Sequence, residues 1–476
     1  MIVTLNGMGE PLMTGLQTKS DRAEKSAAVD SLFEAWTQGR RPGGAVGIFH
    51  KGEAVHRKGY GFANLSTGAE IDPQTPFRLA SLTKPFVALA IMILEERGAL
   101  NYDDPVVRYL PGFSSSEKVT LRHLLTHTSG VEDYEELFLQ AGVIEAKYPT
   151  SSEAGPRGYE PSLQETVELL ARQPLRFMPG DEWEYSNSGY VLLASVAEHV
   201  SGLPLARILQ EHIFGPLGMH DSRLSEHAQP EAELNNRAKG YIFNEDAYTE
   251  ADYSPLNAIY GPDGIYSTLD DMIRWCEALG SEKLVKSSTM KEAFTSGELN
   301  SGARAGYGFG WFIGTNFGLP AVSHTGSWMG YRSFLSYYPS QELGIVVLGN
   351  FGEFDDDVRS HLGNRLGKLY LGGGRVTSNR VNLEDNVLQR YAGKYEFQNG
   401  EFFEIELQQG VLWMKSAYSS SVLVPESKVK FFVDGAESDT YFFNEDMAGR
   451  VNGVTRHLSL YGYSKDAYSW ARKLNT

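Results

Sequence analysis

The chain has 476 residues, a formal net charge of -17 and 41% hydrophobic residues. This length and apolar content supply a large core in two or three domains. The acidic balance argues against nucleic acid and anionic membrane surfaces as partners, because both require basic patches. A single cysteine, Cys276, excludes an internal disulfide, and its place in an apolar helical pattern is typical of a buried, inert thiol.

Residues 1–25 are expected to form a tail. They lack the basic start and the continuous apolar segment of a secretory leader. No apolar run approaches the length of a membrane helix. We therefore expect a cytoplasmic protein, with export through a leader absent from this sequence as the alternative. An amphipathic helix at 26–36 and strands at 44–49 and 54–60 are predicted next.

The first motif that carries chemistry is Ser81-Leu82-Thr83-Lys84. Residues 77–80 are typical of a short buried strand or turn, and Pro85 is tolerated only in a first helical turn, so a helix is predicted from about Ser81. Serine and lysine three residues apart share a helix face. A serine is a weak nucleophile until a base takes its proton, and a lysine is a base only when it is neutral. Ser81 and Lys84 are therefore a candidate nucleophile and its activator.

Three other Ser-x-x-Lys pairs lie in polar surroundings, which are typical of solvated surface lysines: Ser115/Lys118, Ser288/Lys291 and Ser427/Lys430.

A mostly helical region is predicted from about 100 to 290, and it contains the only Tyr-x-Asn of the chain, Tyr185-Ser186-Asn187. A loop with a turn at 179–180 precedes this motif and an apolar helix at 189–198 follows it. Beside a lysine the pKa of a phenol falls, which would make Tyr185 a proton acceptor. The Asn187 amide offers both donors and an acceptor.

A third motif, His324-Thr325-Gly326-Ser327, ends a strand-like stretch at 319–323. Gly326 would let a substrate backbone approach closely, and the N–H groups of Ser81 and Ser327 would form an oxyanion hole. Further strands at 310–313, 331–338 and 344–348 precede a helix at 355–371. Sheet segments at both ends of a helical region predict an α+β core with an all-α insertion, with the site between them.

The spacing of the apolar residues changes from helical to alternating after a glycine-rich stretch at 372–379. We expect a linker at 372–385 and a second domain at 386–476, where short alternating runs predict a small antiparallel β-barrel. The segment 391–395 resembles the start of a lipocalin-like domain found after some serine hydrolases. We give similar weight to a structural role and to a role at the mouth of the active site or in a homo-oligomer.

The order Ser-x-x-Lys, Tyr-x-Asn, His-Thr-Gly resembles that of the class C β-lactamase-like serine hydrolases. The resemblance runs from about 24 to 371 and includes the segments 121–130, 213–219, 261–268 and 307–311. It implies the fold of the serine β-lactamases and DD-peptidases for a domain at 26–371.

The resemblance also implies a role for each motif residue. Ser81 would be the acylated nucleophile, and Lys84 and Tyr185 would share the proton transfers, with the general base left open between them. Asn187 would bond the substrate or steady Lys84. Thr325 and Gly326 would line the strand along which the substrate lies.

His324 stands where many β-lactamases and DD-carboxypeptidases of this superfamily carry a lysine. Histidine is mostly neutral at pH 7, which favours amides, esters or peptides without an essential carboxylate at this point. At lower pH, a protonated His324 would be expected to supply the missing charge.

The function that we expect is hydrolysis through an acyl-enzyme, as in a penicillin-binding-protein-type peptidase or amidase acting on D-amino-acid-containing or small peptides. A carboxylesterase with weak β-lactamase activity is the alternative, and a non-catalytic penicillin-binding sensor or scaffold is the alternative of another class. No cofactor is expected. His123 and His127 have a spacing that suits a metal, but no third ligand accompanies them, so no metal is expected either.

Overall fold

The structure is a computed structural model in which the described residues are 19–113, 118–144, 159–226, 234, 236–244, 246–317, 319–353, 356–371, 380–397, 402–415, 420–433, 436–445, 450–457 and 468–474. Residues 1–18 of the predicted tail and 372–379 of the predicted linker lie outside these ranges.

A six-stranded antiparallel sheet joins the two ends of the first domain in the order β10-β11-β12-β13-β1-β2. Each predicted strand has a counterpart, although β10 lies further along the chain than predicted and β11 is longer. The strands are β1 Gly44–His50, β2 Glu53–Tyr60, β10 Phe312–Asn316, β11 Leu319–Trp328, β12 Tyr331–Tyr338 and β13 Leu343–Gly349. The two halves meet where β1 pairs with β13, Gly44 opposite Gly349 and His50 opposite Leu343.

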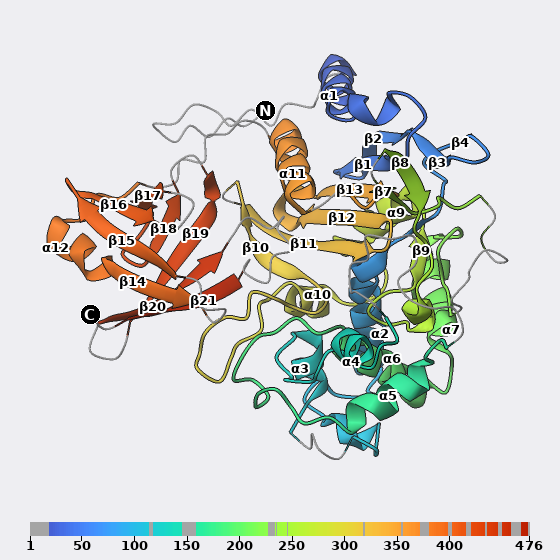
Figure 1. Cartoon of the computed structure of the whole chain (residues 1–476), viewed down its shortest axis with the longest axis horizontal. Helices are drawn as coiled ribbons and strands as arrows, with labels where there is room; N and C mark the ends of the chain where they lie inside the picture. Colours follow the sequence, from blue (N-terminus) through green and yellow to red (C-terminus); the bar gives the residue numbers. More distant parts are fainter. Residues whose placement is uncertain are drawn as a thin grey trace, which may run out of the picture.

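Both faces of this sheet are buried at its central strands, which explains why β13 is apolar along its whole length. Successive side chains point to opposite faces. Ile345 and Val347 join a core that also contains Val29 and Leu366, from α1 (Lys19–Leu32) and α11 (Asp356–Leu371). Val346 and Leu348 join the larger core with the helical region. Figure 1 shows α1 and α11 on one side of the sheet and α2 on the other.

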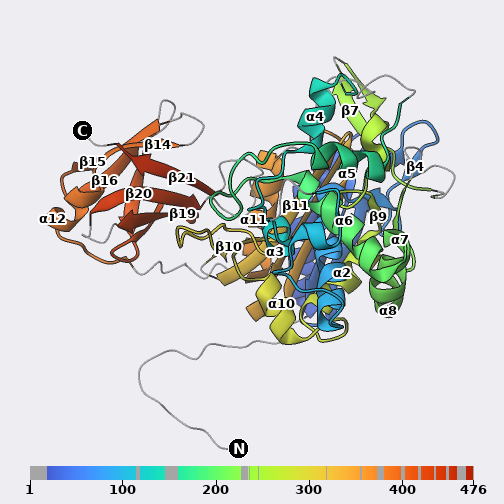
Figure 2. The same cartoon turned by 90° about the horizontal axis from the view of Figure 1, so that it is seen from below.

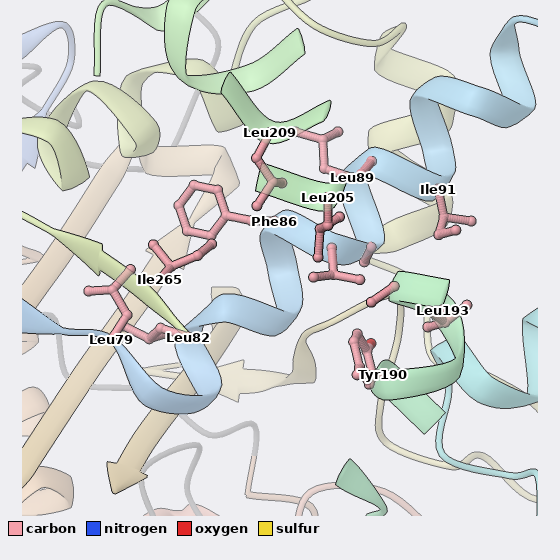
Figure 3. Close-up of a cluster of buried hydrophobic side chains, with 14 of the residues drawn as sticks. Leu79, Leu82, Phe86, Leu89, Ile91, Tyr190, Leu193, Leu205, Leu209 and Ile265 are labelled. Carbon is pink, nitrogen blue, oxygen red and sulfur yellow. The ribbon is translucent and has the colours of Figure 1, made fainter. Parts of the chain in front are cut away.

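The helical region is centred on α2 (Lys84–Glu96), whose residues from Lys84 to Leu94 are all buried. A helix buried on every side needs no polar face, which accounts for its uniformly apolar sequence. In Figure 3, Phe86 and Leu89 of α2 lie with Leu205 and Leu209 of α7. The helices of this region are α3 Leu121–Leu125, α4 Tyr134–Gln140, α5 Leu163–Ala171, α6 Asn187–Ser201, α7 Leu205–Leu209, α8 Gly215–Leu217, α9 Leu269–Leu279 and α10 Ser287–Ala293.

Short strands connect the helical region to the sheet. A three-stranded sheet has the order β5-β9-β6, with β5 Phe77–Arg78, β6 Arg223–Leu224 and β9 Ile265–Ser267. Two hairpins complete the domain, β3 (Phe62–Asn64) with β4 (Ala69–Glu70) and β7 (Tyr241–Asn244) with β8 (Ala247–Glu250).

The first helix begins before the predicted residue 26 and ends at Leu32, where a short turn at Glu34–Thr37 follows. A chain of polar side chains fastens it to β2. Ser26 Oγ lies 3.0 Å from His56 Nδ1, His56 Nε2 lies 3.0 Å from the Tyr60 hydroxyl, and that hydroxyl donates to Asp30. This chain, formed between residues distant in sequence, stabilises a helix whose start the apolar pattern placed too late.

The C-terminal region forms the predicted antiparallel barrel. Eight strands close in sequence order, and β14 pairs with β21. Its interior is packed by its own core, which includes Tyr391, Tyr395, Phe403 and Phe443. In both views the barrel lies on the β10 side of the six-stranded sheet (Figures 1 and 2). The strands are β14 Gly393–Phe397, β15 Phe402–Gln408, β16 Val411–Lys415, β17 Ser420–Pro425, β18 Lys430–Val433, β19 Ala436–Glu445, β20 Val451–His457 and β21 Tyr468–Lys473.

Within the described ranges, no single helix is long and apolar enough to cross a membrane. One pair of helices, Asn187–Ser201 and Leu205–Leu217, reaches that length and apolarity only when the two are taken together, and the pair is bent by 78°.

Candidate active site

The predicted nucleophile lies at the turn that opens α2. A short 3-10 helix, Ala80–Thr83, continues into α2 at Lys84, so the helical backbone begins at the predicted point. Lys84 Nζ lies 2.9 Å from Ser81 Oγ. Ala80, directly before Ser81, has a left-handed φ of +50°. This conformation costs a non-glycine residue about 1–2 kcal/mol and is held by the surrounding packing.

Lys84 is completely buried, and this burial lowers the pKa of its amine to about 7 in spite of the opposing charges of Glu135, Asp263 and Asp133. Besides Ser81, Nζ contacts Asn187 Oδ1 at 2.8 Å and the Pro262 carbonyl at 3.1 Å. A neutral amine has two N–H donors and one lone pair. The two oxygens of Asn187 and Pro262 can only accept, whereas the Ser81 hydroxyl can donate. When the amine is neutral, its two N–H groups can donate to Asn187 and Pro262, which leaves its lone pair to accept the Ser81 proton.

Asn187, the first residue of α6, is held by the start of α4. Its Nδ2 donates to Glu135 Oε1 at 3.0 Å, and its backbone N–H donates to Asp133 Oδ2 at 2.8 Å. Because the amide nitrogen is engaged with a carboxylate, the amide oxygen faces Lys84. Of the two expected roles of Asn187, this geometry favours steadying Lys84. The sequence alone assigned no role to Asp133 and Glu135, although they lie shortly after the segment 121–130 that carries the family resemblance.

Tyr185 lies against the same lysine. The Lys84 Nζ is 4.8 Å from the centre of the Tyr185 ring, and the phenolic oxygen is buried. Phe312 stacks on the ring, with 6.4 Å between centroids, and His127 packs closer, at 4.3 Å. The structure thus brings the first two motifs together around one amine.

Pro262 is held in place by a buried ion pair between the next residue, Asp263, and Arg78. Arg78 lies on β5, two residues before the Ser81 turn begins, and its Nε donates to Asp263 Oδ2 at 3.0 Å. Arg78 is 1% exposed. Two buried charges that bond each other in this way tie the loop that carries the Pro262 carbonyl to the strand that leads into Ser81.

His324 is fully buried on β11, and both of its ring nitrogens are hydrogen-bonded within the protein. Nδ1–H donates to the Thr325 carbonyl at 2.6 Å, so the unprotonated Nε2 accepts from the Tyr307 hydroxyl at 2.8 Å. Burial, together with the nearby Lys84 charge, lowers the pKa of His324 to about 3. The expectation that His324 gains a charge at moderately low pH is therefore wrong. Tyr307 is a further residue that the sequence analysis left without a role.

Gly326 contacts the nucleophile turn. A Cβ on Gly326 would lie 2.2 Å from the Leu79 carbonyl oxygen and 2.3 Å from Ser333 Oγ, which itself donates to that carbonyl at 2.6 Å. The close approach of β11 to the Ser81 turn therefore requires glycine at this position. The approach of a substrate backbone to Gly326, which the sequence predicts, stays a prediction.

The strand β11 also continues beyond the predicted residue 323 to Trp328. Its pairing with β10 ends at Phe312 opposite Ser323, whereas its pairing with β12 extends to Trp328 opposite Tyr331. Thr325, Gly326 and Ser327 therefore lie on a part of β11 that extends past β10 and beside the Ser81 turn.

We expect Gly326→Ala to lower kcat by roughly 100-fold, the scale on which a displacement of about 1 Å disturbs a catalytic arrangement. The added methyl group must push the Leu79 carbonyl, and with it the Ser81 turn, away from β11. Steady-state kinetics measures the loss. Gly112→Ala is the matched control, because a Cβ there meets nothing within 4 Å. Full activity of Gly326→Ala would contradict this account of the glycine.

Among the residues that the structure describes, no group of three or more histidine, cysteine, aspartate or glutamate side chains could hold a metal ion. His123 caps α3 together with Thr120, and His127 packs against Tyr185.

The α+β sheet, its helical insertion and the buried serine–lysine pair define a class of serine acyl-transferases and hydrolases. A family model described as Beta-lactamase matches residues 28–367. The chain belongs to this family, which confirms the resemblance drawn from the three motifs.

The relatives differ in activity. The chain is 29% identical to a penicillin-binding protein of Bacillus subtilis (strain 168), over 90% of this chain and 96% of that protein. It is 31% identical to esterase EstB of Burkholderia gladioli, over 69% of this chain and 90% of that protein. The structure of an octameric penicillin-binding protein homologue from Pyrococcus abyssi has a TM-score of 0.59 and 23% identity, covering 94% of this chain and 99% of that one. This last likeness concerns the fold.

Proposed function

We propose that this chain is a serine hydrolase that works through an acyl-enzyme on Ser81 and acts on amides of D-amino acids or on small peptides that contain them. The observation that carries the proposal is the fully buried Lys84 amine, which lies 2.9 Å from Ser81 Oγ and whose pKa burial lowers to about 7, so that it can accept the Ser81 proton. The family membership, which includes penicillin-binding proteins, esterases and D-aminopeptidases, supports hydrolysis as the reaction class.

In the proposed reaction, Ser81 Oγ attacks the carbonyl carbon of the substrate while its proton passes to Lys84 Nζ. The N–H groups of Ser81 and Ser327 stabilise the oxyanion. The leaving group takes a proton from the unit formed by Lys84 and Tyr185, and the C–N or C–O bond breaks to give the acyl-enzyme. Water, activated by the same unit, then attacks the acyl carbon and releases Ser81 with its proton.

The charges around the site support a preference among substrates. His324 is neutral, and Asp263 is paired with Arg78. Asp133 and Glu135 accept hydrogen bonds from Asn187. Because His324 supplies no cation, the site favours a substrate that is neutral or carries a free amine, and it disfavours a carboxylate beside the scissile bond.

A panel of four substrates tests the proposal through relative kcat/KM: a D-alanyl anilide, an acyl-D-Ala-D-Ala peptide, nitrocefin and a nitrophenyl butyrate. We expect the D-alanyl anilide to give the highest value. Turnover of the butyrate alone would instead make the protein a carboxylesterase. A fluorescent penicillin that stays attached, with no turnover of any of the four, would make it a sensor.

His324→Lys should raise the ratio of kcat/KM for acyl-D-Ala-D-Ala over the anilide, because the lysine adds a cation beside β11. In the unmodified protein this ratio should contain no titration of His324 between pH 5 and 8, since its pKa is about 3.

Tyr307→Phe is the control for this prediction. It removes the hydrogen bond to His324 Nε2 without adding charge, and it should leave the ratio unchanged. Active sites are counted by covalent labelling, so that poorly folded His324→Lys protein does not distort the comparison. An unchanged ratio in folded His324→Lys would contradict the charge argument.

A further inference from the structure

The loop that follows α3 lies directly against the loop that carries Tyr185. Thr128 O accepts from Gly180 N–H at 2.8 Å, and Gly130 O accepts from Arg176 N–H at 2.8 Å. A Cβ on Gly130 would lie 2.2 Å from the Phe177 carbonyl oxygen, so only glycine allows this approach. The two loops are therefore packed backbone to backbone beside the site.

His127 is the residue of this loop that holds the backbone on both sides of Tyr185. Its carbonyl oxygen accepts from Glu184 N–H at 3.0 Å, and its ring Nδ1 accepts from Ser186 N–H at 3.2 Å. The imidazole ring also packs on the Tyr185 ring, with 4.3 Å between the centroids. One residue thus contacts the backbone N–H of the residue before Tyr185, the backbone N–H of the residue after it, and the Tyr185 side chain.

The backbone of His127 is itself in the left-handed conformation, with φ +58°. Asparagine, aspartate and histidine adopt this conformation more readily than other non-glycine residues. In this conformation the carbonyl and the ring of one residue reach the N–H groups of Glu184 and Ser186, the residues on either side of Tyr185.

The hydrogen bond also fixes the chemical state of the ring. Because a backbone N–H is always the donor, Nδ1 must carry the lone pair, and the proton of the neutral ring is on Nε2. The side chain is 1% exposed, and burial lowers the pKa of His127 well below its ordinary value. The Nδ1 lone pair is already occupied, so it does not take a proton from the substrate.

We propose that His127 is a positioning residue. It fixes the phenol of Tyr185 against Lys84 by accepting hydrogen bonds from the N–H groups of Glu184 and Ser186, the residues on either side of Tyr185. This inference rests on the proposed function, in which Tyr185 takes part in proton transfer. A shift of about 1 Å in such a group costs about 100-fold in rate. The Ser186 hydrogen bond is the contact that a side-chain substitution can remove while the carbonyl contact stays.

Two substitutions separate the acceptor from the ring. In His127→Asn the amide Oδ1 occupies the position of Nδ1, the ring is lost, and asparagine tolerates the left-handed backbone. In His127→Phe a ring is kept and the acceptor is lost. We expect kcat with the D-alanyl anilide to fall about 10- to 100-fold in His127→Phe and to stay within about threefold of the parent in His127→Asn. KM should change little in either variant, because His127 acts on Tyr185 and not on the substrate.

Hydrogen exchange reports the proposed contact directly. The amide of Ser186 should exchange faster in His127→Phe than in the parent and in His127→Asn. The kcat values are normalised to the active sites counted in the burst of product, so loss of folded protein does not count as loss of catalysis. Equal losses in both variants, a loss in His127→Asn alone, or no loss in either would overturn the inference.

A double substitution distinguishes this failure from failure of the proposed function. In a Tyr185→Phe background, His127→Phe should cost little further activity, because it acts through the phenol that is already absent. If Tyr185→Phe itself leaves kcat unchanged, the assigned role of Tyr185 fails and the His127 inference fails with it. If Tyr185→Phe is inactive but His127→Phe is fully active, only the inference about His127 fails.

Discussion

Ser81→Ala is expected to lower kcat for every hydrolysed ester or amide by a factor on the order of 10⁴ to 10⁶, the range seen when a serine nucleophile is removed. The physical reason is that no other hydroxyl is placed 2.9 Å from the buried Lys84 amine in the described structure. Stopped or steady-state kinetics measures the loss, and mass spectrometry should find no adduct with a fluorophosphonate or a penicillin.

Ser288→Ala is the matched control for this prediction. Ser288 and Lys291 have the same spacing as Ser81 and Lys84 and lie on the helix α10, but both are exposed to solvent. Ser288 and Lys291 lack the buried surroundings that make the Lys84 amine a base for Ser81. Ser288→Ala should therefore keep full activity. A covalent adduct on Ser81→Ala protein would show that the nucleophile lies elsewhere.

The local sequence could predict which serine–lysine pair is buried, but not the contacts around it. The spacing places Ser81 and Lys84 on one face, and it does the same for Ser288 and Lys291. Only burial separates the two pairs, and the apolar run after Pro85 was the signal for it. The contacts that match a neutral Lys84 come from Asn187 and Pro262, which are distant in sequence, so no local pattern could predict them.

The same limit applies to the third motif. The third motif begins with a histidine, and the sequence predicts a mostly neutral ring for it. It could not predict that both nitrogens are occupied by Tyr307 and Thr325, because those bonds form only when β11 packs into the interior. At Gly326 the sequence predicted the close approach of a substrate backbone, which stays a prediction, whereas the close approach that the structure shows is that of the Leu79 carbonyl.

The strands were predictable to within a few residues because their apolar runs are bounded by turns. β12 runs from Tyr331 to Tyr338 as predicted. The errors lie at ends that are set by tertiary contacts. The helix α1 begins at Lys19, and in the part that the sequence missed Arg22 forms an ion pair with Glu53 of β2. The strand β11 extends to Trp328 because β12 continues beside it.

The second large effect concerns proton transfer. Lys84→Met, which keeps the length of the side chain and removes the amine, and Tyr185→Phe should each lower kcat by roughly 10² to 10⁴, the contribution of general acid–base catalysis. If the two groups act as one unit, the double variant should be little worse than the poorer single variant. Losses that multiply fully in the double variant would contradict a shared role.

The pH dependence identifies which group of this unit is the base. Burial lowers the pKa of Lys84 to about 7, and the base must be neutral to accept the Ser81 proton. The value of kcat/KM should therefore rise with pH through about 7 and level off above it, because the neutral fraction of Lys84 rises in that window. Tyr185→Phe should keep this rise at a lower rate, whereas the residual activity of Lys84→Met should lose it. A rise that persists in Lys84→Met and disappears in Tyr185→Phe would assign the base to Tyr185 instead.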